Sequence, residues 1–167
     1  SGIGDGAFLT GSDGSHLFNL AHPNDTGYMQ HGEAVAANNT YAVVGAPYTE
    51  VSGQFRQGQV FLYSTSTGNL EYTISIPGGG ANKTFGFSVD VDDTHLAIGC
   101  SSRYEGGNQV FLYDISSGAP SLVWTSNGSS LGAERHGCSV ALTDSYVYAG
   151  HYKGCLLYTS PSPRDLS

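Results

Sequence analysis

The chain has 167 residues, and its 6 Lys and Arg against 14 Asp and Glu give a formal net charge of -8. Six cations cannot neutralise a phosphate backbone or an anionic membrane surface, so we expect no nucleic-acid partner and no charge-driven membrane binding. No apolar run approaches the roughly 20 residues that span a bilayer, so we expect no direct membrane insertion. The 24 Gly and a charged fraction of only 12% are common in β-rich secreted modules.

The chain contains repeated segments with a period of about 50 residues, which is typical of propeller blades. A degenerate first copy lies at 6–23, where GAFLTGSDGSHLFNLAHP pairs with GQVFLYSTSTGNLEYTISIP. The string VFLY occurs at 60–63 and again at 110–113. Three further segments align: HGEAVAANNTYAVVGAP from His31, FGFSVDVDDTHLAIGCS from Phe85 and HGCSVALTDSYVYAGHY from His136.

Each copy predicts four short strands. The first shows period-two alternation, as in FGFSVDV at 85–91. The second (YAVVG, HLAIG or YVYAG) follows a polar turn at Asn38-Asn39, Asp92-Asp93 or Thr143-Asp144. Tight turns tolerate Asn and Asp because their side chains bond the local backbone. QVFLY is the third strand, and LEYTISI or SLVWTS is the fourth. Four strands per repeat, separated by Gly-rich loops, are typical of a β-propeller blade.

The predicted fold is therefore all-β, a partial β-propeller of about three blades, each a four-stranded antiparallel sheet. The repeats divide the chain as follows: 1–30 is the end of a degenerate first repeat, 31–84 and 85–135 are two repeats, and 136–154 starts a truncated one.

The end of the chain has a different origin in our interpretation. CLLYTSPSPRD at 155–165 resembles the translation of a transposase adapter used in short-read DNA libraries. The spacing from Gly150 to Gly154 is also shorter than the matching spacing in the other copies. We therefore expect 155–167 to be a non-native tail, and the chain to be a fragment of a longer one.

Two glycines recur at fixed places in the repeats. The first set is Gly32, Gly86 and Gly137, and the second is Gly45, Gly99 and Gly150. A residue without Cβ at two fixed places implies close backbone approach or positive φ, so we predict that these glycines are architectural.

FGFSV followed by LAIG, and HGEAV followed by VVGAP, resemble the FG-GAP repeat of the integrin alpha-subunit propeller. They are closer to the calcium-free FG-GAP repeats of secreted and cell-surface microbial proteins, and the resemblance covers 6–154. It implies a whole of seven blades, an extracellular or cell-surface location and a ligand at the loop face. The sequence departs from the pattern in two ways. His replaces the first Phe at 31 and 136, and the Ala-Pro that follows Gly is present only at 46–47.

We predict no calcium site, no site for another metal and no cofactor. Integrin-type repeats often carry an Asp-x-Asp-x-Asp-Gly calcium loop, but DVDD at 90–93 has no wrapping loop and no Gly. The six His lack the short paired spacing of zinc ligands. His31 and His136 occupy the position of Phe85, so we interpret them as aromatic stand-ins near the contacts between repeats.

No catalytic residue is predicted. GFSVD and GCSVA lack the closing Gly of a nucleophile elbow, and the first copy has Ala34 at the Ser position. The alternative is the propeller of a quinone-dependent dehydrogenase, whose Gly-x-x-x-Trp motif loosely resembles TGNLEY and SGAPSL. Trp124, however, lies too far from Gly118 for that motif. A scaffold for a catalytic domain outside the fragment is a further alternative.

Two cysteines, Cys100 and Cys138, remain outside the tail. Small buried thiols are the default interpretation, and a disulfide between the two stays open. Four N-x-[ST] sequons beside predicted turns could carry glycans in a eukaryotic secretory host; they begin at Asn24, Asn38, Asn82 and Asn127.

The loops at 47–57 and 101–107 differ in length between copies, and they contain the aromatic and Arg side chains that interfaces favour. Our contact candidates are Tyr48, Phe55, Arg56, Arg103 and Tyr104. The alternative for each is an ordinary solvated loop residue. The sequence thus predicts a non-enzymatic adhesion-type module that binds a protein or glycan through its loop face. The remaining blades of its own chain are the other expected partners.

Overall fold

The computed structural model describes residues 6–24, 30–102, 108–127, 136–151 and 158–161, and the regular secondary structure in these ranges consists of β-strands joined by turns. The all-β prediction is confirmed. No helix in these ranges could cross a membrane. The strands are β1 (Gly6–Thr10), β2 (His16–Ala21), β3 (Ala34–Ala37), β4 (Tyr41–Ala46), β5 (Gln59–Ser64), β6 (Leu70–Ser75), β7 (Phe85–Val91), β8 (His95–Ser101), β9 (Asn108–Asp114), β10 (Ser121–Asn127), β11 (Ser139–Leu142), β12 (Tyr146–Gly150) and β13 (Tyr158–Pro161).

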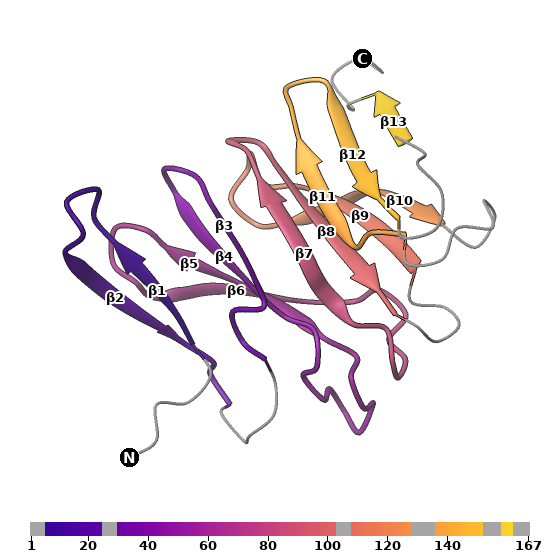
Figure 1. Ribbon diagram of the computed structural model, residues 1–167, viewed down its shortest axis with the longest axis horizontal. Coiled ribbons are helices and arrows are strands. Elements are labelled where there is room, and N and C mark those ends of the chain that lie inside the picture. The colour runs from indigo at the N-terminus through magenta and orange to yellow at the C-terminus, as the bar shows by residue number, and fades with distance from the viewer. Residues whose placement is uncertain (1–5, 25–29, 103–107, 128–135, 152–157, 162–167) are drawn as a thin grey trace.

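The strands form four antiparallel sheets whose neighbours follow chain order. β1 and β2 form a hairpin, β3 to β6 and β7 to β10 form two four-stranded sheets, and β11 to β13 form a three-stranded sheet. Figure 1 shows the sheets as an open row, with the turns between first and second strands all pointing to one side. The β3–β6 sheet lies within the range 31–84, and the β7–β10 sheet lies within the range 85–135.

The first two strands of each repeat pair in the same register. Gly45 lies opposite Ala34, Gly99 opposite Ser88, and Gly150 opposite Ser139. The turn before the second strand is also capped alike in the first two repeats. Asn38 Oδ1 accepts from the N–H of Tyr41 (2.7 Å), and Asp92 Oδ1 accepts from the N–H of His95 (2.7 Å). Equivalent residues therefore occupy equivalent places in successive sheets.

Successive sheets pack face to face, because alternate residues of an inner strand point to opposite neighbours. On β5, Phe61 and Tyr63 join the cluster shared with β1 and β2, whereas Val60 and Leu62 join the cluster shared with the β7–β10 sheet. On β9, Val110 and Leu112 continue the alternation toward β12. The inner strands are consequently buried on both faces, and β4 and β8 are buried along their whole length.

Glycines mark the closest approach between sheets. A Cβ on Gly45 would overlap the carbonyl oxygen of Gly86, and a Cβ on Gly99 would overlap that of Gly137. Gly86 and Gly137 themselves have φ of 88° and 85°, a conformation that L side chains rarely adopt. The second-strand glycine of one sheet thus lies against the first-strand glycine of the next.

His31 packs in the manner of Phe85, and His136 is buried at the equivalent position of its repeat. The Phe85 and Phe111 rings lie edge to face at 5.4 Å, and the His31 and Phe61 rings at 5.3 Å. His136 is 1% exposed, and its Nε2 shares a hydrogen bond of 2.7 Å with Ser126 Oγ. The ring contact of His31 fits its interpretation as an aromatic stand-in. His136 shares the burial of Phe85 but makes a polar contact.

We expect His136 to make the protein sensitive to acid. Burial lowers the pKa of His136 below the ordinary 6.5, and nearby His151 lowers it further. The unfolded chain therefore binds a proton at higher pH than the folded chain, so this contribution to stability is present above about pH 6.5 and decreases as the pH falls. The free energy of unfolding from urea denaturation should fall less between about pH 7.5 and about pH 5 in His136→Phe than in wild type. Equal pH dependence in both would contradict this role.

Cys100 and Cys138 do not form a disulfide in the structure. Cys100 is buried and Cys138 is half-buried, and both thiols are free. Burial raises the pKa of the Cys100 thiol, which disfavours the reactive thiolate.

β13 pairs with the open edge of β12. Any extended segment can add to an open edge through backbone hydrogen bonds, so the non-native origin of 155–167 stays a prediction.

Candidate interaction surface

The loop between β4 and β5 brings three of the predicted contact residues together. The guanidinium carbon of Arg56 lies 5.2 Å from the ring centre of Tyr48 and 4.9 Å from that of Phe55. Phe55 is 55% exposed, and Tyr48 and Arg56 are half-buried. We name Tyr48, Phe55 and Arg56 the Arg56 cluster. Sequence reasoning selected these residues one by one but did not predict that they stack.

Backbone hydrogen bonds hold the Arg56 cluster in place. The segment that leads into β7 donates from the N–H of Asn82 to the Phe55 carbonyl (2.8 Å) and from the N–H of Thr84 to the Arg56 carbonyl (3.0 Å). Arg56 itself has φ of 52°, in the left-handed region that costs a non-Gly residue free energy. The two backbone bonds on either side of this residue fix a conformation that its side chain alone does not favour.

The base of the loop is buried. Thr49 and Gln57 are 2% and 4% exposed, and Gln57 Oε1 accepts from the N–H of Gly80 (3.1 Å). The N–H of Gly58 donates to the Thr49 carbonyl (3.0 Å) and closes the loop. A rigid base under an exposed tip is what a binding loop requires, because little conformational entropy is lost on association.

The Arg56 cluster combines an apolar surface with hydrogen-bond donors. The guanidinium over two aromatic rings is held by cation–π attraction. Its five N–H groups lie in one plane and can donate to carbonyl, carboxylate or hydroxyl oxygens of a ligand. Among the described residues, no ion pair involves Arg56. The exposed ring of Phe55 offers an apolar contact beside these donors.

The other predicted residues are placed as follows. Arg103 and Tyr104 lie outside the described residues. Asn24 is exposed, Asn82 is half-buried with φ of 57°, and Asn127 ends β10. The Asn38 side chain is engaged, because its Nδ2 donates to the Asp92 carbonyl of the next sheet (2.7 Å). A glycan on Asn38 Nδ2 would disturb this contact.

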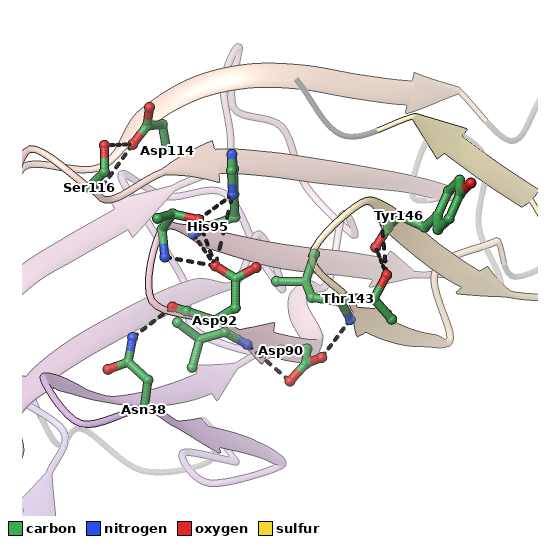
Figure 2. A network of polar contacts seen from close by, with 11 residues as sticks. Asn38, Asp90, Asp92, His95, Asp114, Ser116, Thr143 and Tyr146 are labelled. Carbon is green, nitrogen blue, oxygen red and sulfur yellow. Dashed lines mark hydrogen bonds and ion pairs between the residues drawn. The ribbon is translucent and has the colours of Figure 1, made fainter. Parts of the chain in front are cut away.

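Figure 2 shows a polar network at the end of the sheets that lies away from the Arg56 cluster. Its hydrogen bonds cap turns and join neighbouring sheets. Asp92 Oδ1 accepts from both the N–H and the Oγ1–H of Thr94, at 2.7 and 3.0 Å. Asp90 Oδ2 accepts from the N–H of Leu142 on the next sheet (2.6 Å). The carboxylates of DVDD therefore bind backbone donors in different places. No group of three His, Cys, Asp or Glu in the described ranges could hold a metal ion.

The residues on which the enzymatic alternatives were considered contact neighbouring parts of the fold. Ser88 of GFSVD donates to the Gly137 carbonyl of the next sheet (2.8 Å). Trp124 lies half-buried on β10 and packs against the cluster of Val110 and Val147.

A second feature, which sequence reasoning missed, is an apolar cleft beside β3. Its volume is ≈ 300 Å³, and it lies between β1, β3 and β4. Val35 on β3 and Phe8 on β1 line it, and each is 62% exposed. The signal was present in the sequence, because the degenerate copy at 6–23 aligns only with third and fourth strands.

Comparisons with known proteins assign no family. No family model matches the chain, and no curated protein matches it. The chain is similar to a solved structure described as the computationally designed Ika4 protein, with 14% sequence identity and a TM-score of 0.35. That alignment covers 77% of this chain and 89% of the designed one. Similarity at this level carries no argument about fold or function.

Proposed function

We propose that the chain is part of an FG-GAP-type β-propeller that acts as a non-enzymatic interaction module outside the cell or at its surface. Support for the propeller comes from sheets of four antiparallel strands that stack face to face in equal register. A single sheet of this kind cannot bury both faces alone, and stacking of repeats supplies the missing partner surface. The resemblance of FGFSV and LAIG to FG-GAP repeats supports the location.

The Arg56 cluster is the observation that carries the binding function. Tyr and Arg are enriched among residues that dominate binding energy, especially where they are held rigidly. The cluster presents a stacked guanidinium beside an exposed Phe55, on a loop fixed by backbone bonds. Its chemistry suits a ligand with acceptor oxygens next to an apolar face. A protein loop or a glycan has that chemistry, and the net charge of -8 disfavours a polyanion.

The proposal predicts ligands that depend on the Arg56 cluster. The full chain, immobilised, is screened against a printed glycan array and a phage-displayed peptide library. Binders should lose at least about tenfold in affinity with Phe55→Ala and with Arg56→Ala, because each substitution removes a central contact. Surface plasmon resonance measures the loss.

Leu122→Ala is the matched control, since Leu122 is 45% exposed on β10. It should leave binding unchanged. Binders that tolerate both loop substitutions, or two screens without any binder, would count against this function.

A further inference from the structure

Left-handed backbone conformations are concentrated around the Arg56 cluster. Five non-Gly residues in the described part of the chain have positive φ, and four of them lie in two adjoining segments: Ser52, Arg56, Asn82 and Thr84. The hydrogen bonds from Asn82 to Phe55 and from Thr84 to Arg56 join these segments. Such conformations cost free energy and cluster at binding sites, so their concentration marks this end of the β3–β6 sheet as a site.

The loop between β4 and β5 also contains a small hairpin of its own. The N–H of Gln54 donates to the Val51 carbonyl (2.9 Å), and the N–H of Val51 donates to the Gln54 carbonyl (3.3 Å). Ser52 and Gly53 between them both have positive φ, as a type I′ turn requires. The Arg56 cluster therefore follows a closed turn and precedes the buried base of the loop, so its side chains are presented from a defined backbone.

The guanidinium of Arg56 keeps its hydrogen-bond donors for a ligand. Its carbon lies 5.2 Å and 4.9 Å from the ring centres of Tyr48 and Phe55. The rings attract its charge, whereas its five N–H groups lie in the guanidinium plane. Within the described ranges, no hydrogen bond or ion pair engages these N–H groups. Glu50 of the same loop is exposed and forms no ion pair with Arg56.

The distribution of charge favours an anion at this site, although the chain is acidic overall. Arg56 and Lys83 are the only Lys or Arg side chains among the described residues, and they lie in the two adjoining segments. Carboxylates occupy the turns at the opposite end of the sheets, on Asp13, Asp92, Asp93, Asp114 and Asp144. The potential of the described residues is therefore most favourable to a negative group near the Arg56 cluster.

We propose that Arg56 binds a single carboxylate in an acidic peptide segment of a partner protein, while Phe55 contacts an apolar side chain next to that carboxylate. A carboxylate matches the planar fork of a guanidinium and accepts two parallel hydrogen bonds. A peptide can place one carboxylate beside an apolar residue. An acidic polysaccharide carries charge on successive sugars, which the exposed Glu50 and the net charge of -8 would repel.

The test is an NMR titration of the isotope-labelled full chain with the blocked tripeptide Leu-Asp-Leu. The tripeptide should shift the side-chain Nε–Hε signal of Arg56 and the amide signal of Phe55, and the shifts should approach saturation by about 20 mM. The neutral tripeptide Leu-Asn-Leu should bind at least about tenfold more weakly, because it loses the charge-assisted hydrogen bonds.

Three variants identify the group that binds. Arg56→Lys keeps the charge but loses the fork, so its affinity for Leu-Asp-Leu should fall at least about tenfold. Lys83→Gln is the matched control, and it should change the affinity by less than about threefold, because a charge that does not touch the ligand acts only through screened attraction. Glu50→Gln should bind at least as tightly as wild type, since it removes a like charge from the same loop.

Arg56→Gly separates binding from folding. Gly accepts the φ of 52° without strain, so the variant should stay folded while tripeptide binding is lost. Its thermal unfolding midpoint should lie within about 3 °C of wild type. No saturable shift with Leu-Asp-Leu, equal binding of Leu-Asn-Leu, or full binding to Arg56→Lys would refute the proposal. Tighter binding of the methyl glycoside of N-acetylneuraminic acid than of Leu-Asp-Leu would overturn the peptide in favour of an acidic glycan.

This inference rests on the proposed function and names the ligand class of the same cluster, but the two can fail separately. Screens without any binder would count against the function, whatever the tripeptide does. Binders that depend on Arg56 in the screens, together with a tripeptide that does not bind, would keep the function and refute the carboxylate.

Discussion

Replacement of Phe85 by alanine is expected to lower the free energy of unfolding by about 3–5 kcal/mol. Phe85 is 0% exposed and lies in the cluster that joins the β3–β6 and β7–β10 sheets. Its ring packs edge to face on Phe111 at 5.4 Å, and truncation removes that contact and leaves a cavity between sheets. Urea denaturation followed by circular dichroism measures the loss.

Phe55→Ala is the matched control for this truncation. Phe55 is 55% exposed at the loop tip, so its removal should change stability by less than about 0.5 kcal/mol. Similar losses in the two variants would mean that the two sheets do not pack through Phe85. A Phe85→Ala variant as stable as wild type would also mean that the two sheets do not pack through Phe85.

Gly45→Ala is expected to cost about 3 kcal/mol, because the new methyl group would overlap backbone rather than a movable side chain. The nearest atom is the carbonyl oxygen of Gly86 on the next sheet, and the Gly86 carbonyl carbon follows at 3.1 Å. The sheets must separate locally to admit the methyl group. Thermal and urea unfolding of the variant measure the cost.

Gly150→Ala tests the same position of the repeat in the last sheet of the described residues, where no following sheet lies against it. The added methyl group would meet the hydroxyl of Ser139, which can rotate away. The expected cost is below about 1 kcal/mol. If Gly45→Ala were as mild as Gly150→Ala, the close contact between successive sheets would be wrong.

The sequence predicted the strands well because the repeats compare several copies of one structure. Turns at Asn38 and Asp92 recur at one place in each copy, and the side chains cap those turns as predicted. The alternation of Phe85, Phe87, Val89 and Val91 located β7. His31 and His136 could be read as aromatic stand-ins only because Phe85 stands at the same position.

The arrangement of the loop could not be predicted, because it depends on contacts between distant segments. Arg56 adopts a left-handed φ, and the bonds that hold it come from Asn82 and Thr84. No local pattern in 47–57 indicates that Tyr48 and Phe55 flank the guanidinium. The cleft beside β3 was indicated by the degenerate copy at 6–23, which aligns only with third and fourth strands. Val35 itself gave no sign of the cleft, because it follows the strand pattern whether or not a neighbouring sheet covers it.

The account depends on successive sheets that stack through paired glycines, and nuclear Overhauser contacts measure this directly without any substitution. Gly45 Cα lies 3.3 Å from the Cβ position of Gly86, and the Cβ position of Gly99 lies 3.1 Å from the carbonyl carbon of Gly137. A carbon-edited NOESY spectrum of the full chain should show Hα–Hα cross-peaks between Gly45 and Gly86 and between Gly99 and Gly137. A spectrum in which the strands are formed but both cross-peaks are missing would contradict the stacking of the sheets.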